Sequence, residues 1–108
     1  MEKPETAAPA VSRKEQKRLQ AEQRKQLQPL RASVRAAERE MDQLHVRQAE
    51  LEETLADVEI YKEENKGRLT RLLQEKTAID IRCQEVEAQW LEFSERLESM
   101  QAAADPSG

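Results

Sequence analysis

The residues best suited to chemistry in this sequence form a cationic run near the amino terminus. Between residues 12 and 35, eight Lys and Arg side chains stand against Glu15 and Glu22, which leaves a net charge of +6. The eight are Arg13, Lys14, Lys17, Arg18, Arg24, Lys25, Arg31 and Arg35. Side chains of this kind neutralise backbone phosphates without reading base sequence, so the segment is a candidate nucleic-acid-binding surface.

A second interpretation of the same residues is a solvated cationic helix face that binds nothing. The residues alone leave both interpretations open. Because the whole chain carries −4, the residues outside 12–35 must sum to −10. The overall acidity of the chain therefore conceals a localised basic segment.

Residues that commonly carry catalysis are few. Gly67 and Gly108 are the only glycines, which is too few for a glycine-rich phosphate loop. The sequence also does not place Ser, His and Asp residues as a catalytic triad on a scaffold with a cleft. His45 is predicted to be solvated or ion-paired, and Cys83 to be a small buried hydrophobe. We therefore expect a chain that is not an enzyme and holds no metal or cofactor.

Two long helices are predicted to position these residues. With 37% of residues charged and 3% aromatic, the composition does not favour a layered globular core. Apolar residues instead recur at alternating steps of three and four, which is the heptad pattern of a coiled coil. The first series is Leu27, Leu30, Val34, Ala37, Met41, Leu44, Gln48, Leu51, Leu55 and Val58. The second is Leu69, Leu72, Lys76, Ile79, Cys83, Val86, Trp90, Phe93, Leu97 and Met100.

The predicted fold class is all-α, an antiparallel two-helix coiled-coil hairpin. Folding the second series back onto the first pairs Val58 with Leu69 near the tip and sets Ala37 opposite Trp90, a small residue against a large one. Gln48 then faces Ile79, and Lys76 faces Leu51, so two polar layers weaken the middle. His45 falls near Asp80 in this register.

The expected boundaries follow from capping and turn residues. We expect a flexible linker over 1–11, a hairpin domain over 12–101 and a disordered tail over 102–108. Within the hairpin, helix one covers about 12–58, the tip about 59–68 and helix two about 69–101. Ser12 and Glu15 could form a capping box at the first helix start, and Pro29 is expected to kink or break that helix.

Apolar stretches in the sequence are far shorter than the roughly 20 residues that span a bilayer. Residues 1–10 mix charge and proline and do not resemble a secretory signal. A single cysteine fits a reducing compartment. These features predict a cytoplasmic protein without a membrane partner.

Several motifs, in this order and spacing, resemble the carboxy-terminal coiled-coil domain of the Uup and YheS branch of ABC-F ATPases. They are the basic opening SRKEQKRLQAEQRKQLQPLR, Leu55-Ala56-Asp57 followed by Tyr61, Leu69-Thr70-Arg71-Leu72, and Trp90-Leu91-Glu92. The likeness covers residues 12–101.

The resemblance implies a final domain of a larger ATP-binding cassette protein, with ATP and Mg bound by cassette domains that this chain lacks. It implies ribosome-associated work in translation, and contact of the residues from Arg13 to Arg35 with DNA, ribosomal RNA or tRNA. The alternative is a protein-interaction or spacer hairpin without direct nucleic-acid contact. A monomeric hairpin is expected, although heptads also permit pairing between chains.

Overall fold

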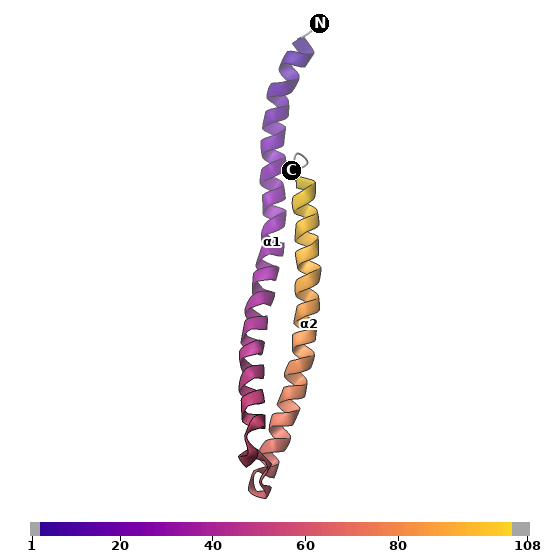
Figure 1. Cartoon of the computed structure of the whole chain (residues 1–108). Coiled ribbons are helices and arrows are strands. Elements are labelled where there is room, and N and C mark those ends of the chain that lie inside the picture. The colour runs from indigo at the N-terminus through magenta and orange to yellow at the C-terminus, as the bar shows by residue number, and fades with distance from the viewer. Residues whose placement is uncertain (1–2, 105–108) are drawn as a thin grey trace.

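The computed structural model describes the backbone of residues 3–104 and the side chains of residues 12–103. Every regular element in that range is helical. The order is α1 (Lys3–Ala56), two 3-10 turns, η1 (Val58–Tyr61) and η2 (Glu63–Asn65), and α2 (Lys66–Ala104). The helices run antiparallel and side by side in a rod of 92 × 18 × 15 Å (Figure 1). The predicted all-α helical hairpin is confirmed.

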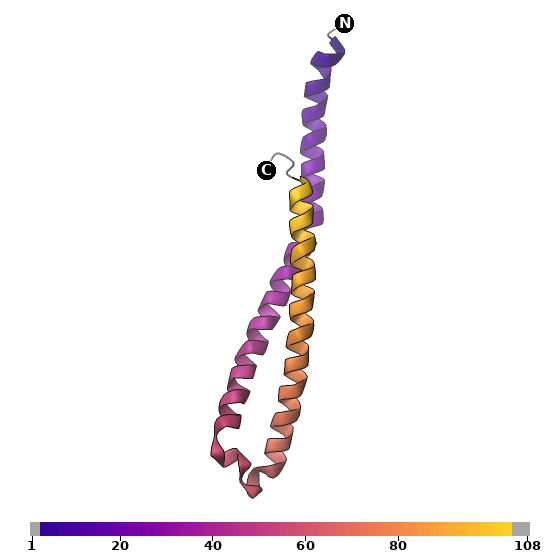
Figure 2. The same cartoon turned by 45° about the vertical axis from the view of Figure 1, so that its right-hand side comes forward.

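The two helices differ in length, 54 residues for α1 and 39 for α2. The amino-terminal part of α1 therefore extends beyond the end of α2 as a single helix (Figure 1). When the molecule is turned by 45°, α1 passes behind α2 (Figure 2), so the helices cross instead of lying flat beside each other. The rod has a paired part and an unpaired part.

The apolar seams lie between the helices. Leu27, Ala37 and Leu51 of α1 and Cys83 and Val86 of α2 are buried. Apart from Val58, the other seam positions are half-buried, because a two-helix interface covers each side chain from one direction only. The heptad spacing thus identified the inward face of both helices.

The helix register agrees with the predicted pairing to within one residue. Trp90 Nε1 donates to Glu38 Oε2 at 3.2 Å, one residue beyond the Ala37 expected opposite it. Gln48 Nε2 donates to Asp80 Oδ1 at 2.9 Å, one residue beyond the expected Ile79. These two hydrogen bonds define the register of α1 against α2.

Two bidentate ion pairs cross between the helices beside the seam. Arg47 donates to both carboxylate oxygens of Glu75 at 2.7 Å each, and Arg82 donates to those of Glu40 at 2.6 and 3.0 Å. The arginine hydrogen bonds hold the pKa of each glutamate below its ordinary value. Acidic and basic groups in the middle of the rod therefore neutralise one another.

His45 differs from its expected place. Its Nε2 lies 3.7 Å from Glu87 Oε1, not near Asp80. Asp80 instead accepts from Gln48 and from Lys76 Nζ, the latter at 2.7 Å. The Lys76 hydrogen bond, with a smaller contribution from Gln48, lowers the pKa of Asp80. The two polar seam positions are thus joined through one carboxylate.

The tip begins earlier than expected. α1 ends at Ala56, and Asp57 leaves the helix with φ −79° and ψ 125° while its Oδ1 accepts from the backbone N–H of Glu59 at 3.0 Å. This turn rotates Val58 outward, where it is 77% exposed, and Ile60 inward, where it is 2% exposed. The prediction that Val58 is the last seam residue was wrong, and Ile60 takes that role.

Hydrogen bonds from side chains hold the tip in place. Tyr61 Oη donates to the Leu55 carbonyl at 2.6 Å, and Asn65 Nδ2 donates to the Glu59 carbonyl at 2.8 Å. α2 then starts at Lys66, earlier than the expected residue 69. The tip consequently occupies residues 57–65 instead of 59–68.

The outer ends of both helices are longer than predicted. α1 begins at Lys3, so the backbone over 3–11 is helical where a linker was expected, and Ser12 is not the helix start. Pro4 lies in the first turn, where its missing N–H has no helical partner to lose, and alanines dominate the next turn. α2 continues to Ala104, into the expected tail. Residues 1–2 and 105–108 of the linker and tail predictions lie outside the described residues.

Pro29 does not break α1. The helix runs through it as one element, and Figure 1 shows a continuous ribbon at this level. An interior proline costs about 3 kcal/mol in an exposed helix. Here Pro29 is exposed, while Leu27 on one side is buried and Leu30 on the other is half-buried in the seam. Packing against α2 on both sides of the proline supports the helix where one backbone hydrogen bond is lost.

Candidate nucleic-acid interface

The eight basic residues predicted as a binding surface lie along one side of α1. At about 100° per residue, side chains seven positions apart nearly superimpose, so Lys17, Arg24 and Arg31 form one row. Arg18 and Lys25 form a second row beside it. Lys14 and Arg35 fall between the two rows, and Arg13 lies at one margin. The set spans an arc of about 140°, and we call these eight residues the basic face.

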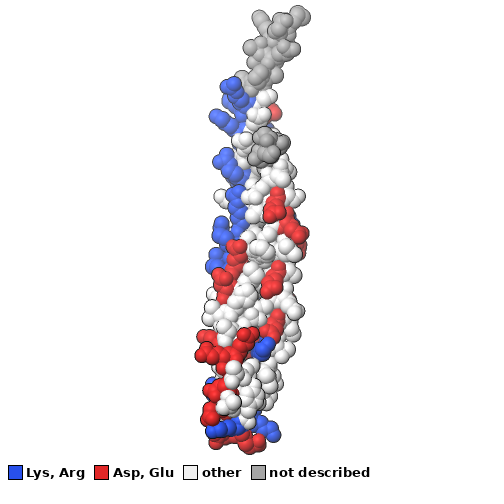
Figure 3. Space-filling view, viewed as in Figure 1, with Lys and Arg blue, Asp and Glu red and all other residues white. Residues whose placement is uncertain are grey.

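The basic face is open to solvent. Seven of its members are exposed and Arg31 is half-buried. Figure 3 shows Lys and Arg following one edge of α1 in the upper half of the rod, with Asp and Glu over α2 and lower on α1. The structure therefore separates the two signs of charge along the rod.

Acidic side chains do not neutralise the basic face within the described residues. Glu15 and Glu22 lie beside the row of Arg18 and Lys25, at three- and four-residue spacing, but neither forms an ion pair with it among residues 12–103. The ion pairs among residues 12–103 join Arg47, Lys62, Lys76, Arg82 and Arg96 to their carboxylates, and His45 lies near Glu87. No member of the basic face takes part in these contacts. These cations are therefore available for an external anion.

About half of the basic face lies on the unpaired part of α1. All side chains from Ser12 to Glu22 are exposed. The positions that continue the heptad seam there are Gln16, Gln20 and Gln23, which are polar and give a partner helix nothing apolar to cover. This segment is a single helix with one cationic side.

Three members of the basic face meet around Pro29. Lys25, Arg31 and Arg35 line a shallow surface depression together with Gln28, Pro29 and Ala32. Because proline lacks an N–H, the Lys25 carbonyl loses its helical donor at this level. The lower part of the basic face is thus concave, whereas the upper part is the plain surface of a helix.

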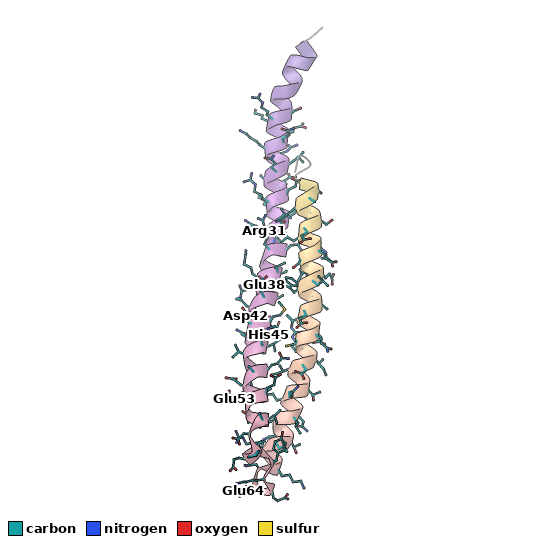
Figure 4. The ribbon with its side chains drawn as sticks, viewed as in Figure 1. Arg31, Glu38, Asp42, His45, Glu53 and Glu64 are labelled. Atoms are coloured by element: carbon teal, nitrogen blue, oxygen red, sulfur yellow. The ribbon has the colours of Figure 1, made fainter. Side chains whose placement is uncertain are left out.

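Sequence reasoning missed Arg39. It is exposed, continues the row of Arg18 and Lys25 at seven-residue multiples, and pairs with no carboxylate among the described residues. The seven-residue spacing from Lys25 could have identified it. The row of Arg31 ends instead in Glu38 and His45, which lie at successive levels of α1 (Figure 4). The row of cations that contains Arg31 therefore ends before Glu38.

The three aromatic side chains offer no open ring plane beside the basic face. Trp90 and Phe93 are half-buried against α1, and Tyr61 lies at the tip with its hydroxyl bonded to Leu55. Base stacking needs an exposed aromatic plane beside the cations. The arrangement suits contact with phosphates and not with unstacked bases.

Other candidate sites carry less chemistry. Cys83 is buried in the seam, where burial raises the pKa of its thiol and disfavours the reactive thiolate. Among the described residues, no three His, Cys, Asp or Glu side chains are grouped so as to hold a metal ion. Over the same range, neither helix has an apolar stretch long enough to cross a bilayer.

Comparison with known proteins supports the resemblance inferred from the motifs. Over 96 residues the chain is 43% identical to proteins described as "Probable ATP-binding protein YheS" from Escherichia coli K12 and from the O6:H1 and O157:H7 strains. The match covers 89% of this chain but only 15% of each relative. No family model and no solved structure matches the chain. The resemblance is confirmed, and it concerns a small part of a much longer protein.

Proposed function

We propose that this chain is a non-catalytic nucleic-acid-binding coiled-coil domain, and that the basic face is its binding surface. The observation that carries the proposal is the alignment of eight basic side chains on one side of α1 without acidic partners among the described residues. Similarity to YheS over 89% of the chain supports membership in a longer ATP-binding protein, and the motif resemblance implies a place at the carboxy-terminal end of an ABC-F type protein.

In this proposal the ligand is bound through its phosphates. A single α-helix is about 10–12 Å wide, and the major groove of B-form DNA is about 12 Å wide, so the unpaired part of α1 fits where the 18 × 15 Å section of the paired rod does not. Ribosomal RNA, tRNA and DNA all offer phosphates, and contact would be insensitive to sequence.

The longer parent protein would perform the ATPase work. ATP and Mg would be bound by cassette domains outside this chain, in a cytoplasmic, ribosome-associated protein that acts in translation. The hairpin would be a monomeric arm that holds the basic face at a distance from those domains. In this role the hairpin would position its positive charges against the nucleic acid and would catalyse no reaction.

A matched pair of charge variants tests the proposal. Arg13→Gln, Lys14→Gln, Lys17→Gln and Arg18→Gln together remove two arginines and two lysines from the basic face. Lys62→Gln, Lys66→Gln, Arg68→Gln and Arg71→Gln together remove the same charges at the tip. Affinity for labelled duplex DNA and for a structured RNA is measured by fluorescence anisotropy at several salt concentrations.

The basic-face variant is expected to bind more weakly, and its slope of log K against log salt should become shallower by about three to four units, since each neutralised phosphate contributes about 0.9. The tip variant should bind like the wild type. Binding that ignores salt, or an equal loss in both variants, would contradict the proposal and favour the spacer alternative.

A further inference from the structure

The outward side of α2 carries a second strip with heptad spacing. Its steps alternate between four and three from Thr70 to Leu91, about 30 Å at 1.5 Å per residue. All seven positions are exposed and none is charged, in a chain with 37% charged residues. The strip comprises Thr70, Gln74, Thr77, Ile81, Gln84, Ala88 and Leu91, and we call it the outer strip.

The fold of the hairpin does not account for this strip. Ile81 and Leu91 are 54% and 51% exposed, and Leu73, which is 47% exposed, borders the tip end of the strip. The corresponding outward positions of α1 mix charged residues, Arg39, Asp42 and Glu53 among them, with uncharged ones such as Val46 and Ala49. α2 therefore has one face for α1 and a second uncharged face without a partner among the described residues.

Acidic side chains border the half of the outer strip nearer the open end of the hairpin. Asp80 and Glu87 lie along one border, and Glu85 and Glu92 along the other. The three glutamate side chains are 56%, 56% and 65% exposed. At the tip end the borders are Arg71 and Leu73, so the negative charge is confined to one half of the strip.

Neighbouring basic side chains lie at unequal distances from these carboxylates. Asp80 and Glu92 have close partners at 2.7 Å, in Lys76 and Arg96. Glu85 lies 3.4 Å from Arg82, and Glu87 lies 3.7 Å from His45. Arg82 is already bound bidentately to Glu40. Glu85 and Glu87 thus retain charge for an approaching cation on each side of the strip.

We propose that the outer strip docks one α-helix of a partner protein. The alternating spacing fits a helix packed along α2, and the acidic borders require that helix to carry Lys or Arg on both flanks of a stripe of Ala and Leu. Because the acidic borders cover one half of the strip, the basic flanks of the bound helix lie toward the open end of the hairpin. This surface is separate from the basic face and independent of the proposed function.

Two synthetic helical peptides of three heptads provide the probes. Both carry Ala and Leu at alternating three- and four-residue spacing, one with Lys and the other with Glu at the flanking positions. Binding to the full 108-residue chain is measured by fluorescence anisotropy, and amide shifts of the labelled protein locate the contact. The Lys-flanked peptide is expected to bind at least tenfold more tightly, with shifts along residues 77–91.

Ile81→Asp should weaken binding of the Lys-flanked peptide at least tenfold. Val46→Asp is the matched control, since Val46 is a similarly exposed apolar residue, 61% exposed, on α1. Both sites are on the surface, and circular dichroism verifies that both variants remain helical. Neither variant should alter duplex DNA binding, so failure of the docking proposal is distinguishable from failure of the proposed function.

Three results would overturn the docking proposal. One is equal binding of the two peptides, and another is equal binding by Ile81→Asp and the wild type. The third is a concentration-dependent dimer in sedimentation velocity that Ile81→Asp abolishes, because the occupant would then be a second copy of this chain.

Discussion

Gln48 and Lys76 come from opposite helices and bind the same carboxylate, that of Asp80, at 2.9 and 2.7 Å. They are the two polar residues in otherwise apolar seams. Each would leave a polar group facing apolar neighbours if it stood alone, and buried polar groups need partners. The Asp80 carboxylate accepts a hydrogen bond from each of them. The two polar seam residues and Asp80 therefore form one hydrogen-bonded group, which adds no apolar contact to the seam.

Gln48→Leu tests what that connection contributes. Leucine would restore an apolar layer and leave Asp80 bound to Lys76, so we expect the free energy of unfolding to rise by about 1 kcal/mol. Urea denaturation followed by circular dichroism measures the change. Gln43→Leu, at an exposed position of the same helix, should stay within about 0.5 kcal/mol of the wild type. A loss of stability in Gln48→Leu would mean that the hydrogen bond to Asp80 outweighs the apolar gain.

Leu51 is the most completely buried leucine of the seam, at 1% exposed. Leu51→Ala removes that apolar contact and leaves a cavity that two straight helices fill poorly. We therefore expect the free energy of unfolding to fall by about 2–5 kcal/mol, with a value toward the lower end because the interface is narrow. Leu73→Ala is the control, since Leu73 is 47% exposed. The same denaturation experiment should show the control within about 0.5 kcal/mol of the wild type.

The heptad spacing identified the seams because spacing alone determines which side of a helix becomes buried. It could not locate the end of α1, since Val58 and Ile60 are both apolar and either could close the seam. Which of the two is buried depends on the turn capped by Asp57, and the heptad spacing carries no information about that local turn. Likewise, the grouping of Arg24 and Arg31 on one side follows from their spacing, whereas the unpaired part of α1 depends on the length of α2.

Paired substitutions at the tip test this correction. Ile60→Ala should lower the free energy of unfolding by about 2 kcal/mol or more, because it empties a buried site next to both helix ends. Val58→Ala should change it by no more than about 0.5 kcal/mol, because Val58 already faces solvent. If Val58→Ala proved the more costly change, the tip would have the register expected from the heptads.

The interhelix ion pairs predict how stability depends on pH. Glu40, Glu75 and Asp80 have pKa values below their ordinary 4.5, 4.5 and 3.8, chiefly through hydrogen bonds from Arg82, Arg47 and Lys76. The unfolded chain therefore binds protons first as pH falls. Their contribution is complete above the unfolded pKa values and is lost as pH falls through the lower folded values.

The melting temperature should accordingly change little between about pH 7 and 5 and fall below about pH 4.5. Glu40→Gln combined with Glu75→Gln should flatten that fall, since the variant has fewer protons to take up on unfolding. Glu63→Gln combined with Glu64→Gln is the control, because neither residue forms an ion pair within residues 12–103. Thermal melts at closely spaced pH values measure all three proteins, and an unchanged fall in the first variant would contradict the assignment.

The unpaired part of α1 should be the least stable helical segment of residues 12–103. Its side chains from Ser12 to Glu22 are all exposed, and helices that depend on propensity alone open readily. Backbone amides of residues 13–22 should therefore exchange with deuterium far faster than those of residues 44–51, which face α2. If duplex DNA lies along the basic face, adding it should slow exchange in 13–22 and leave 44–51 unchanged. Slower exchange confined to the tip would instead place the nucleic acid on the second basic cluster, which comprises Lys62, Lys66, Arg68 and Arg71.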